Sequence, residues 1–215
     1  MTALPDAAAS PGRPLWPLVF SALAIMGSPG PATVSLTAAG SAYGVRRSAG
    51  YLVGIIAGTT VVLLAVATGI TAALLALPAL RSVLIAAAAA YLVWLAYRIA
   101  NAPPLHAEAH ASDRAGSDPP SLVGGLLLGI ANPKAWVAIA AVYAGAHLAA
   151  RAAADAVARV GVLAVMIVLI NATWLLLGAS IAPWLGNPAH PRRARAVNLG
   201  LAAALLAATL LAVIE

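Results

Sequence analysis

Six apolar stretches, each long enough to cross a lipid bilayer, occupy most of this 215-residue chain. A membrane-spanning helix needs roughly 20 mostly apolar residues. The stretches are residues 15–39, 50–77, 80–99, 121–146, 157–180 and 195–213. Hydrophobic residues make up 63% of the chain and charged residues 8%, which is far from the composition of a soluble domain. The sequence therefore predicts an integral membrane protein.

The six stretches are predicted to be helices. Backbone donors and acceptors in lipid must be satisfied inside a helix or a closed barrel, and these Ala, Leu, Val and Gly runs lack the alternation of barrel strands. The predicted fold is an all-α membrane protein with six transmembrane helices. We expect an N-terminal tail (1–14), a three-helix repeat (15–99), a polar linker (100–120) and a second three-helix repeat (121–215).

Two of the predicted helices carry helix-breaking sequences deep inside them. The segments are Gly27-Ser28-Pro29-Gly30-Pro31 and Gly129-Ile130-Ala131-Asn132-Pro133, and each sets a Gly four residues before a Pro. Proline removes a backbone donor, clashes with the preceding turn and pushes the residue before it out of helical geometry. The first and fourth helices are therefore predicted to break and to free backbone amides and carbonyls at membrane depth.

The paired breaks suggest an inverted repeat. Three helices per half make the second half enter the membrane from the opposite side, and paired breaks then indicate a binding site near the midplane. The alternative is that the prolines only kink packed helices. We favour a site, because a lysine follows directly after the second break.

Lys134 is the only charged residue in the interior of any predicted span. A charge near the bilayer centre costs at least ~2.5–3.5 kcal/mol on insertion scales, so it is expected to face a partner, a cavity or a substrate. The alternative is a snorkelling side chain. The position of Lys134 well inside its span favours a site.

The candidate substrate-binding residues surround the two breaks. They are Ser28, Pro29, Gly30, Pro31, Thr33, Asn132, Pro133, Lys134 and Asn171. Lysine and the amides of a helix N-terminus suit a carboxylate, whereas freed carbonyls suit an ammonium. A zwitterionic amino acid matches both, and the lack of an intramembrane acid favours neutral over strongly cationic ones. For Asn171 an ordinary interhelical hydrogen bond is the simpler interpretation.

The remaining polar residues indicate no enzyme, metal or nucleic-acid site. No span holds an Asp, Glu or His in its interior to activate a nucleophile. Two His and three acids occur in the linker, but its composition is typical of a solvated, flexible segment, so no metal or cofactor is expected. The basic residues lie mostly in short loops, where they orient helices and favour both termini outside, and they form no stripe for nucleic acid.

Small and aromatic residues suggest how the helices pack. Gly50, Gly54 and Gly58 form a smooth stripe for close packing, within one chain or between two copies, so a homo-oligomer stays open. The tryptophans are candidates for anchors at the lipid–water interface. They are Trp16, Trp94, Trp136, Trp174 and Trp184.

Four motifs resemble those of the LysE/RhtB family of amino-acid exporters, from about Leu15 onward. They are Pro29-Gly30-Pro31, Arg46-Arg47-Ser48-Ala49-Gly50 with Gly54 and Gly58 following, Tyr91-Leu92-Val93-Trp94, and Gly129 with Asn132-Pro133-Lys134. The chain departs from the family pattern where Ala90 and Ala96 replace glycines beside the third motif, and around Tyr143-Ala144-Gly145.

The resemblance implies an exporter of amino acids or related small metabolites in the cytoplasmic (inner) membrane, driven by the proton gradient. One alternative is a cation or heavy-metal exporter of the same superfamily. The absence of Cys, His and carboxylates from the span interiors disfavours it. Another alternative is a non-transporting membrane scaffold, which would not need a lysine at a helix break.

Overall fold

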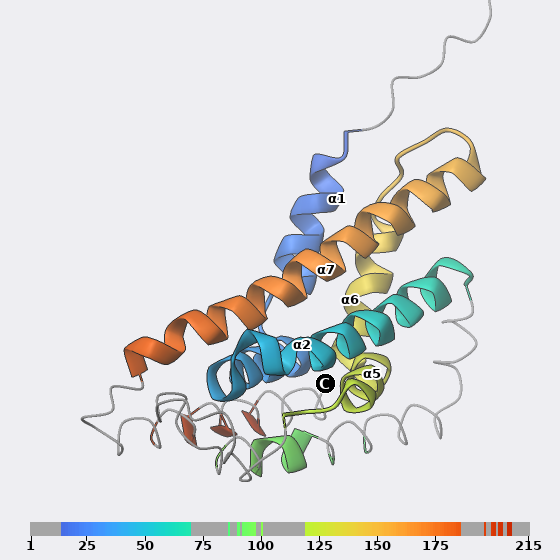
Figure 1. Cartoon of the computed structure of the whole chain (residues 1–215). Coiled ribbons are helices and arrows are strands. Elements are labelled where there is room, and N and C mark those ends of the chain that lie inside the picture. Colours follow the sequence, from blue (N-terminus) through green and yellow to red (C-terminus); the bar gives the residue numbers. More distant parts are fainter. Residues whose placement is uncertain are drawn as a thin grey trace, which may run out of the picture.

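The structure is a computed structural model that describes residues 14–69 and 119–185, together with residues 86, 90, 92–97, 100, 196, 199–200, 202–203 and 206–207. Every regular element within the described residues is a helix (Figure 1).

The first predicted span contains a non-helical segment. Helix α1 (Trp16–Ser21) continues into a short π-helix, η1 (Ala22–Met26), and regular helix resumes in α2 (Pro31–Ala67). Gly30 is extended, with φ −168° and ψ 179°. Pro31 takes the first position of α2, where the missing N–H would have no partner in any case. The local sequence thus ends one helix and starts the next.

Helix α2 is two helices joined at Gly44. This residue has φ 76° and ψ 170°, a backbone region that is open almost only to glycine. Ser48 Oγ donates to Ala39 O at 3.0 Å, and Tyr51 OH donates to Ser35 Oγ at 3.0 Å. The first bond joins residues close to Gly44 in sequence, and the second joins residues farther from it on both sides. The two helices therefore run antiparallel.

The turn at Gly44 corrects the prediction for this part of the chain. Residues 40–49 were expected to form the first loop, but they are helical on both sides of the single glycine. Arg46 and Arg47 are exposed in the first turn of the second helix. Because the turn needs only one glycine, the residues around the arginines form helix and not the predicted loop.

The fourth predicted span is also divided in two. Helix α5 (Leu122–Ala131) starts at Ser121, whose Oγ accepts from Gly124 N at 3.0 Å. Helix α6 (Pro133–Ala144) follows after Asn132, and the two axes differ by 58°. Asn132 has a non-helical ψ of 105°, as expected of a residue before proline.

The last long helix, α7 (Ala152–Leu185), runs beside α2, and α1 and α6 extend toward one end of the described structure (Figure 1). The connection from α6 to α7 is fixed by Asp155, which accepts from Leu148 N and from Ala149 N at 3.0 Å. Asp155 also pairs with Arg159 at 2.8 Å, and Arg159 donates to Tyr143 O at 2.8 Å.

Close backbone packing joins α2 to α5. A Cβ on Gly54 would lie 2.1 Å from Leu122 O, and one on Gly58 would lie 2.3 Å from Leu126 O. Gly50 has more room, since the nearest atom would be 4.0 Å away. The sequence left open whether the glycine stripe packs within one chain or between two copies. For Gly54 and Gly58 the structure shows packing within one chain.

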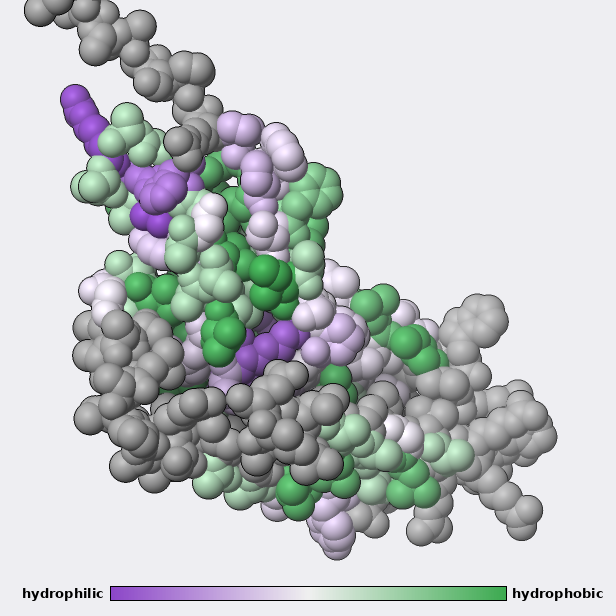
Figure 2. All heavy atoms as spheres, turned by 180° about the vertical axis from the view of Figure 1, so that it is seen from behind, coloured by the Kyte–Doolittle hydropathy of each residue, from purple (hydrophilic) through white to green (hydrophobic). Residues whose placement is uncertain are grey.

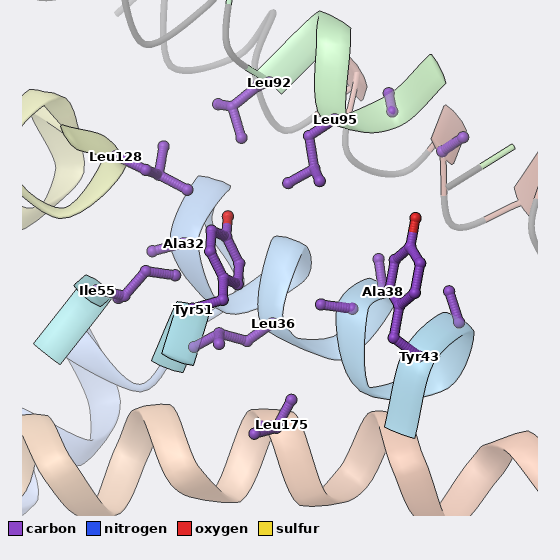
Figure 3. Close-up of a cluster of buried hydrophobic side chains, with 14 residues drawn as sticks. Ala32, Leu36, Ala38, Tyr43, Tyr51, Ile55, Leu92, Leu95, Leu128 and Leu175 are labelled. Atoms are coloured by element: carbon purple, nitrogen blue, oxygen red, sulfur yellow. The ribbon is translucent and has the colours of Figure 1, made fainter. Parts of the chain in front are cut away.

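The buried core includes a cluster around Tyr51, which draws side chains from α2, α5, α7 and residues 92–96 (Figure 3).

The outer surface is mostly apolar, with Val137 67% and Leu127 57% exposed. In Figure 2 the strongest hydrophilic colour gathers where α6 leads into α7 and at one spot near the middle of the described surface. An apolar exterior is the surface that lipid requires.

By length and composition α7 is a candidate membrane span, and so is α2, in which the helix after Gly44 is the longer part. The bent pair α5–α6 counts as a third. The helical membrane fold is therefore confirmed. The predicted spans 121–146 and 157–180 correspond to α5–α6 and α7. Much of the third and sixth spans, and nearly all of the linker, lies outside the described residues. The count of six helices and the inverted repeat stay predictions.

Candidate functional site

Lys134 connects the two helix breaks. It lies in the first turn of α6, and its Nζ donates to Ser28 O, to Ser28 Oγ at 2.8 Å and to Pro29 O at 3.0 Å. All three acceptors belong to the segment between η1 and α2. The lysine therefore lies against the other break, where the sequence analysis expected a partner, a cavity or a substrate.

Gly30 leaves the space through which the lysine passes. A Cβ built on Gly30 would lie 2.5 Å from Lys134 Cδ and 3.1 Å from Lys134 Nζ. Any larger residue would have to push the lysine aside. The glycine between Pro29 and Pro31 thus serves the contact between the breaks.

Two tryptophans bind carbonyls that the breaks leave free. Trp174 of α7 donates from Nε1 to Gly27 O at 3.1 Å, and Trp136 of α6 donates from Nε1 to Ile130 O at 2.7 Å. The sequence analysis considered both as interfacial anchors. The structure gives these two a role at the breaks, because an unpaired carbonyl in an apolar interior needs a donor.

Thr33 caps the start of α2. Its Oγ1 accepts from Gly30 N at 2.8 Å and donates to Gly30 O at 3.1 Å. The hydroxyl is used locally, so it shapes the break.

A small cavity adjoins these residues, with a volume of about 40 Å³. It is lined by Met26, Gly30, Ala32, Thr33, Thr59, Asn132, Lys134, Ala135, Ala138, Ile139, Ile167, Ile170 and Asn171. A cavity of this size holds about two or three water molecules. Its lining is mixed, with polar residues such as Asn132 and Lys134 and apolar residues such as Ile139 of α6 and Ile167 of α7.

Asn132 contributes an oxygen that lacks a partner. The residue is 5% exposed and lines the cavity, and its Oδ1 has no hydrogen-bond partner within the described part of the chain. A buried acceptor left unsatisfied costs about 1–3 kcal/mol, so such a group calls for an explanation. A ligand that brings a donor into the cavity would supply one.

Asn171 reaches the cavity from α7, and its Nδ2 donates to Ile167 O at 2.8 Å in the same helix. The simpler interpretation predicted a hydrogen bond to another helix, but this nitrogen bonds within its own helix. Ile167 and Ile170 line the cavity too, although neither was predicted. Their signal is the helical spacing from Ile167, which lies three residues before Ile170 and four before Asn171 and so shares a face with each of them.

The structure brings most of the predicted site residues together. Gly30, Thr33, Asn132, Lys134 and Asn171 line the cavity, and Ser28 and Pro29 bind Lys134 beside it. Pro31 and Pro133 do not line it, and they start α2 and α6 instead. Thr59, from the second helix of α2, is a further polar lining residue that the sequence analysis missed.

The electrostatics of the site are those of a cation among neutral oxygens. Asp155, the only acidic residue that the structure describes, is bound to the amides of Leu148 and Ala149 and to Arg159. The cavity therefore offers an ammonium, backbone carbonyls and an amide oxygen. These groups can bind a polar molecule, and among the described residues no acid or base pair stands beside them.

Residues 23–215 match the family model described as LysE type translocator. No curated protein and no solved structure matches the chain.

Proposed function

The chain belongs to the LysE type translocator family, and on this premise we propose that it exports amino acids or closely related small metabolites across the cytoplasmic membrane. The observation that carries the proposal is the contact of Lys134 with the first helix break, beside a small, partly polar cavity. A lysine kept in an apolar interior, at the meeting point of two broken helices, is the expected feature of a transport site.

The proposed substrate is a zwitterionic amino acid. Its carboxylate would bind Lys134, and its ammonium would bind carbonyls of the segment between Gly27 and Gly30. A charged group in a low-dielectric site must be paired, and this site offers a partner for each end of the substrate. Export needs no change in the substrate, which agrees with the lack of catalytic groups beside the cavity in the described residues.

The direction and energy source are part of the same proposal. Movement of one half of the molecule against the other would expose the site alternately to each side, as in transporters with inverted repeats. We propose that the proton gradient drives export, with both termini outside the cytoplasm. These assignments follow from the family and from the distribution of arginines in the loops.

Export from intact cells tests the proposal. Cells fed with dipeptides accumulate each amino acid internally, so retention with and without the protein reports the substrate directly. We expect Lys134→Ala to abolish export at an unchanged amount of membrane-inserted protein. We expect Lys134→Arg to restore it only partly, since a planar guanidinium does not replace a compact ammonium.

Val137→Ala provides a matched control on the same helix, because Val137 is 67% exposed and does not line the cavity. It should export as the unaltered protein does. Normal export by Lys134→Ala would reduce the lysine to a packing residue. If the protein changed retention of no amino acid, a scaffold role would replace the exporter.

A further inference from the structure

We propose that the contact between Lys134 and the first break is a self-paired form of the binding site, which the substrate opens by inserting its carboxylate and ammonium between the two partners. Lys134 then exchanges its protein acceptors for the carboxylate, and the carbonyls of Ser28 and Pro29 exchange Lys134 for the ammonium. The proposal rests on the proposed function and adds how the site is filled.

The hydrogen bonds of Lys134 show that the site is occupied by the protein itself. An ammonium has three N–H donors, and Nζ faces three acceptors, which are Ser28 O, Ser28 Oγ and Pro29 O. No donor is left for a carboxylate. A substrate can therefore reach Lys134 only by displacing these oxygens.

The cavity gives an independent reason for opening. Its volume of about 40 Å³ suits about two or three waters and is too small for an amino acid. The breaks must move apart for a substrate to enter. Gly30 permits the closed contact, and both Gly30 and Asn132 line the cavity that must widen.

The unpartnered oxygen of Asn132 fits the same exchange. Asn132 is one of the residues that line the cavity, two positions before Lys134, and its buried Oδ1 has no donor among the described residues. A substrate ammonium carries three N–H groups and can use this oxygen along with a carbonyl of the first break. The closed form thus already contains the acceptor that the open form needs.

The exchange selects molecules that carry both charged groups. A 2-hydroxy acid would take Lys134 but leave the carbonyls of Ser28 and Pro29 without a cationic partner. An amine without a carboxylate would leave Lys134 unpaired in an apolar interior, which is the more costly error. Sites built around such groups reject analogues that lack one of them by large factors.

Ser28→Cys gives a direct test, because the chain contains no cysteine and Lys134 is its single lysine. A thiol at this position would lie beside the ammonium, and a neighbouring lysine promotes the thiolate. In purified full-length protein, we expect the pH midpoint of iodoacetamide alkylation to be lower than that of Ser21→Cys in α1. The exported amino acid should raise this midpoint by about one pH unit, because Lys134 moves away and the substrate carboxylate offsets the substrate ammonium that takes its place beside the thiol.

The double variant Ser28→Cys with Lys134→Gln is the matched control, and it should show neither the low midpoint nor the response. Equal midpoints in the single and double variants would overturn the closed contact. A midpoint that ignores an amino acid exported by the same Ser28→Cys variant would overturn the exchange and leave the proposed function standing. If the unaltered protein exported no amino acid, both proposals would fail together.

Analogues complete the test. The 2-hydroxy acid and the decarboxylated amine of the exported amino acid should leave the midpoint of Ser28→Cys unchanged at concentrations where the amino acid saturates its effect. A 2-hydroxy acid as effective as the amino acid would show that a carboxylate alone opens the pair, and would overturn the requirement for both groups.

Discussion

Gly30 and Lys134 show how far single residues could be understood from the sequence. Lys134 was predicted to matter because a charge inside an apolar span has few inexpensive environments. Gly30 was included because it lies between two prolines. In the structure a Cβ on Gly30 would lie 2.5 Å from Lys134 Cδ, so the glycine leaves room for the lysine. This could not be predicted, because it depends on a contact between segments that are far apart in the sequence.

Gly30→Ala should reduce export while the protein still folds and inserts. The new methyl group must displace the end of Lys134, which is flexible, so the fold can adapt. Misplacing a binding group by about 1 Å can cost on the order of 100-fold in rate, and we expect a loss of tenfold or more. Export per inserted protein is the measurement. Gly50→Ala, where the nearest atom is 4.0 Å away, should export normally.

Asn132→Leu should separate stability from function. The buried Oδ1 lacks a partner and the side chain makes no cap to α6, so removing the amide relieves a cost of about 1–3 kcal/mol. We expect unchanged or higher thermal stability in detergent, together with strongly reduced export. A clear loss of stability would mean that Asn132 has a structural role and is not a ligand-binding residue.

Helices and their breaks were predictable to different degrees. Proline rules act locally, so the sequence could indicate breaks in residues 27–31 and 129–133, and the structure has a non-helical residue in each, Gly30 and Asn132. The turn at Gly44 was missed since the chain has 18 glycines, and nothing local indicates which one adopts φ 76°. The bonds from Trp136 and Trp174 were missed for a related reason, as both tryptophans must first be brought to a break by the packing of α6 and α7.

Gly54→Ala should destabilise the contact between α2 and α5. The added Cβ would meet a backbone oxygen at 2.1 Å, which cannot move without shifting α5. Overpacking of this kind costs about 1–3 kcal/mol. Unfolding in a denaturing detergent series would measure it. Gly161→Ala in α7 is the control, because its Cβ meets nothing within 4 Å and should stabilise the helix slightly.

At the scale of the whole molecule, the distribution of acids sets the final prediction. The chain has six acidic residues, and none lies inside a predicted span. Asp155, the one that the structure describes, is held by two backbone amides and by Arg159. We therefore expect neutral amino acids to be exported in preference to lysine and arginine, because a second cation would find no carboxylate and would be repelled by Lys134.

Competition among amino acids in loaded vesicles measures this preference, with threonine and leucine compared against lysine and arginine. Neutral substrates should win by at least about tenfold, since one unpaired buried charge exceeds the 1.4 kcal/mol that a tenfold ratio represents. Faster export of lysine or arginine would contradict the electrostatic argument while leaving the family assignment intact. An acid such as Glu108 would then have to reach the pathway, and Glu108→Gln would abolish that cationic export but spare the export of threonine.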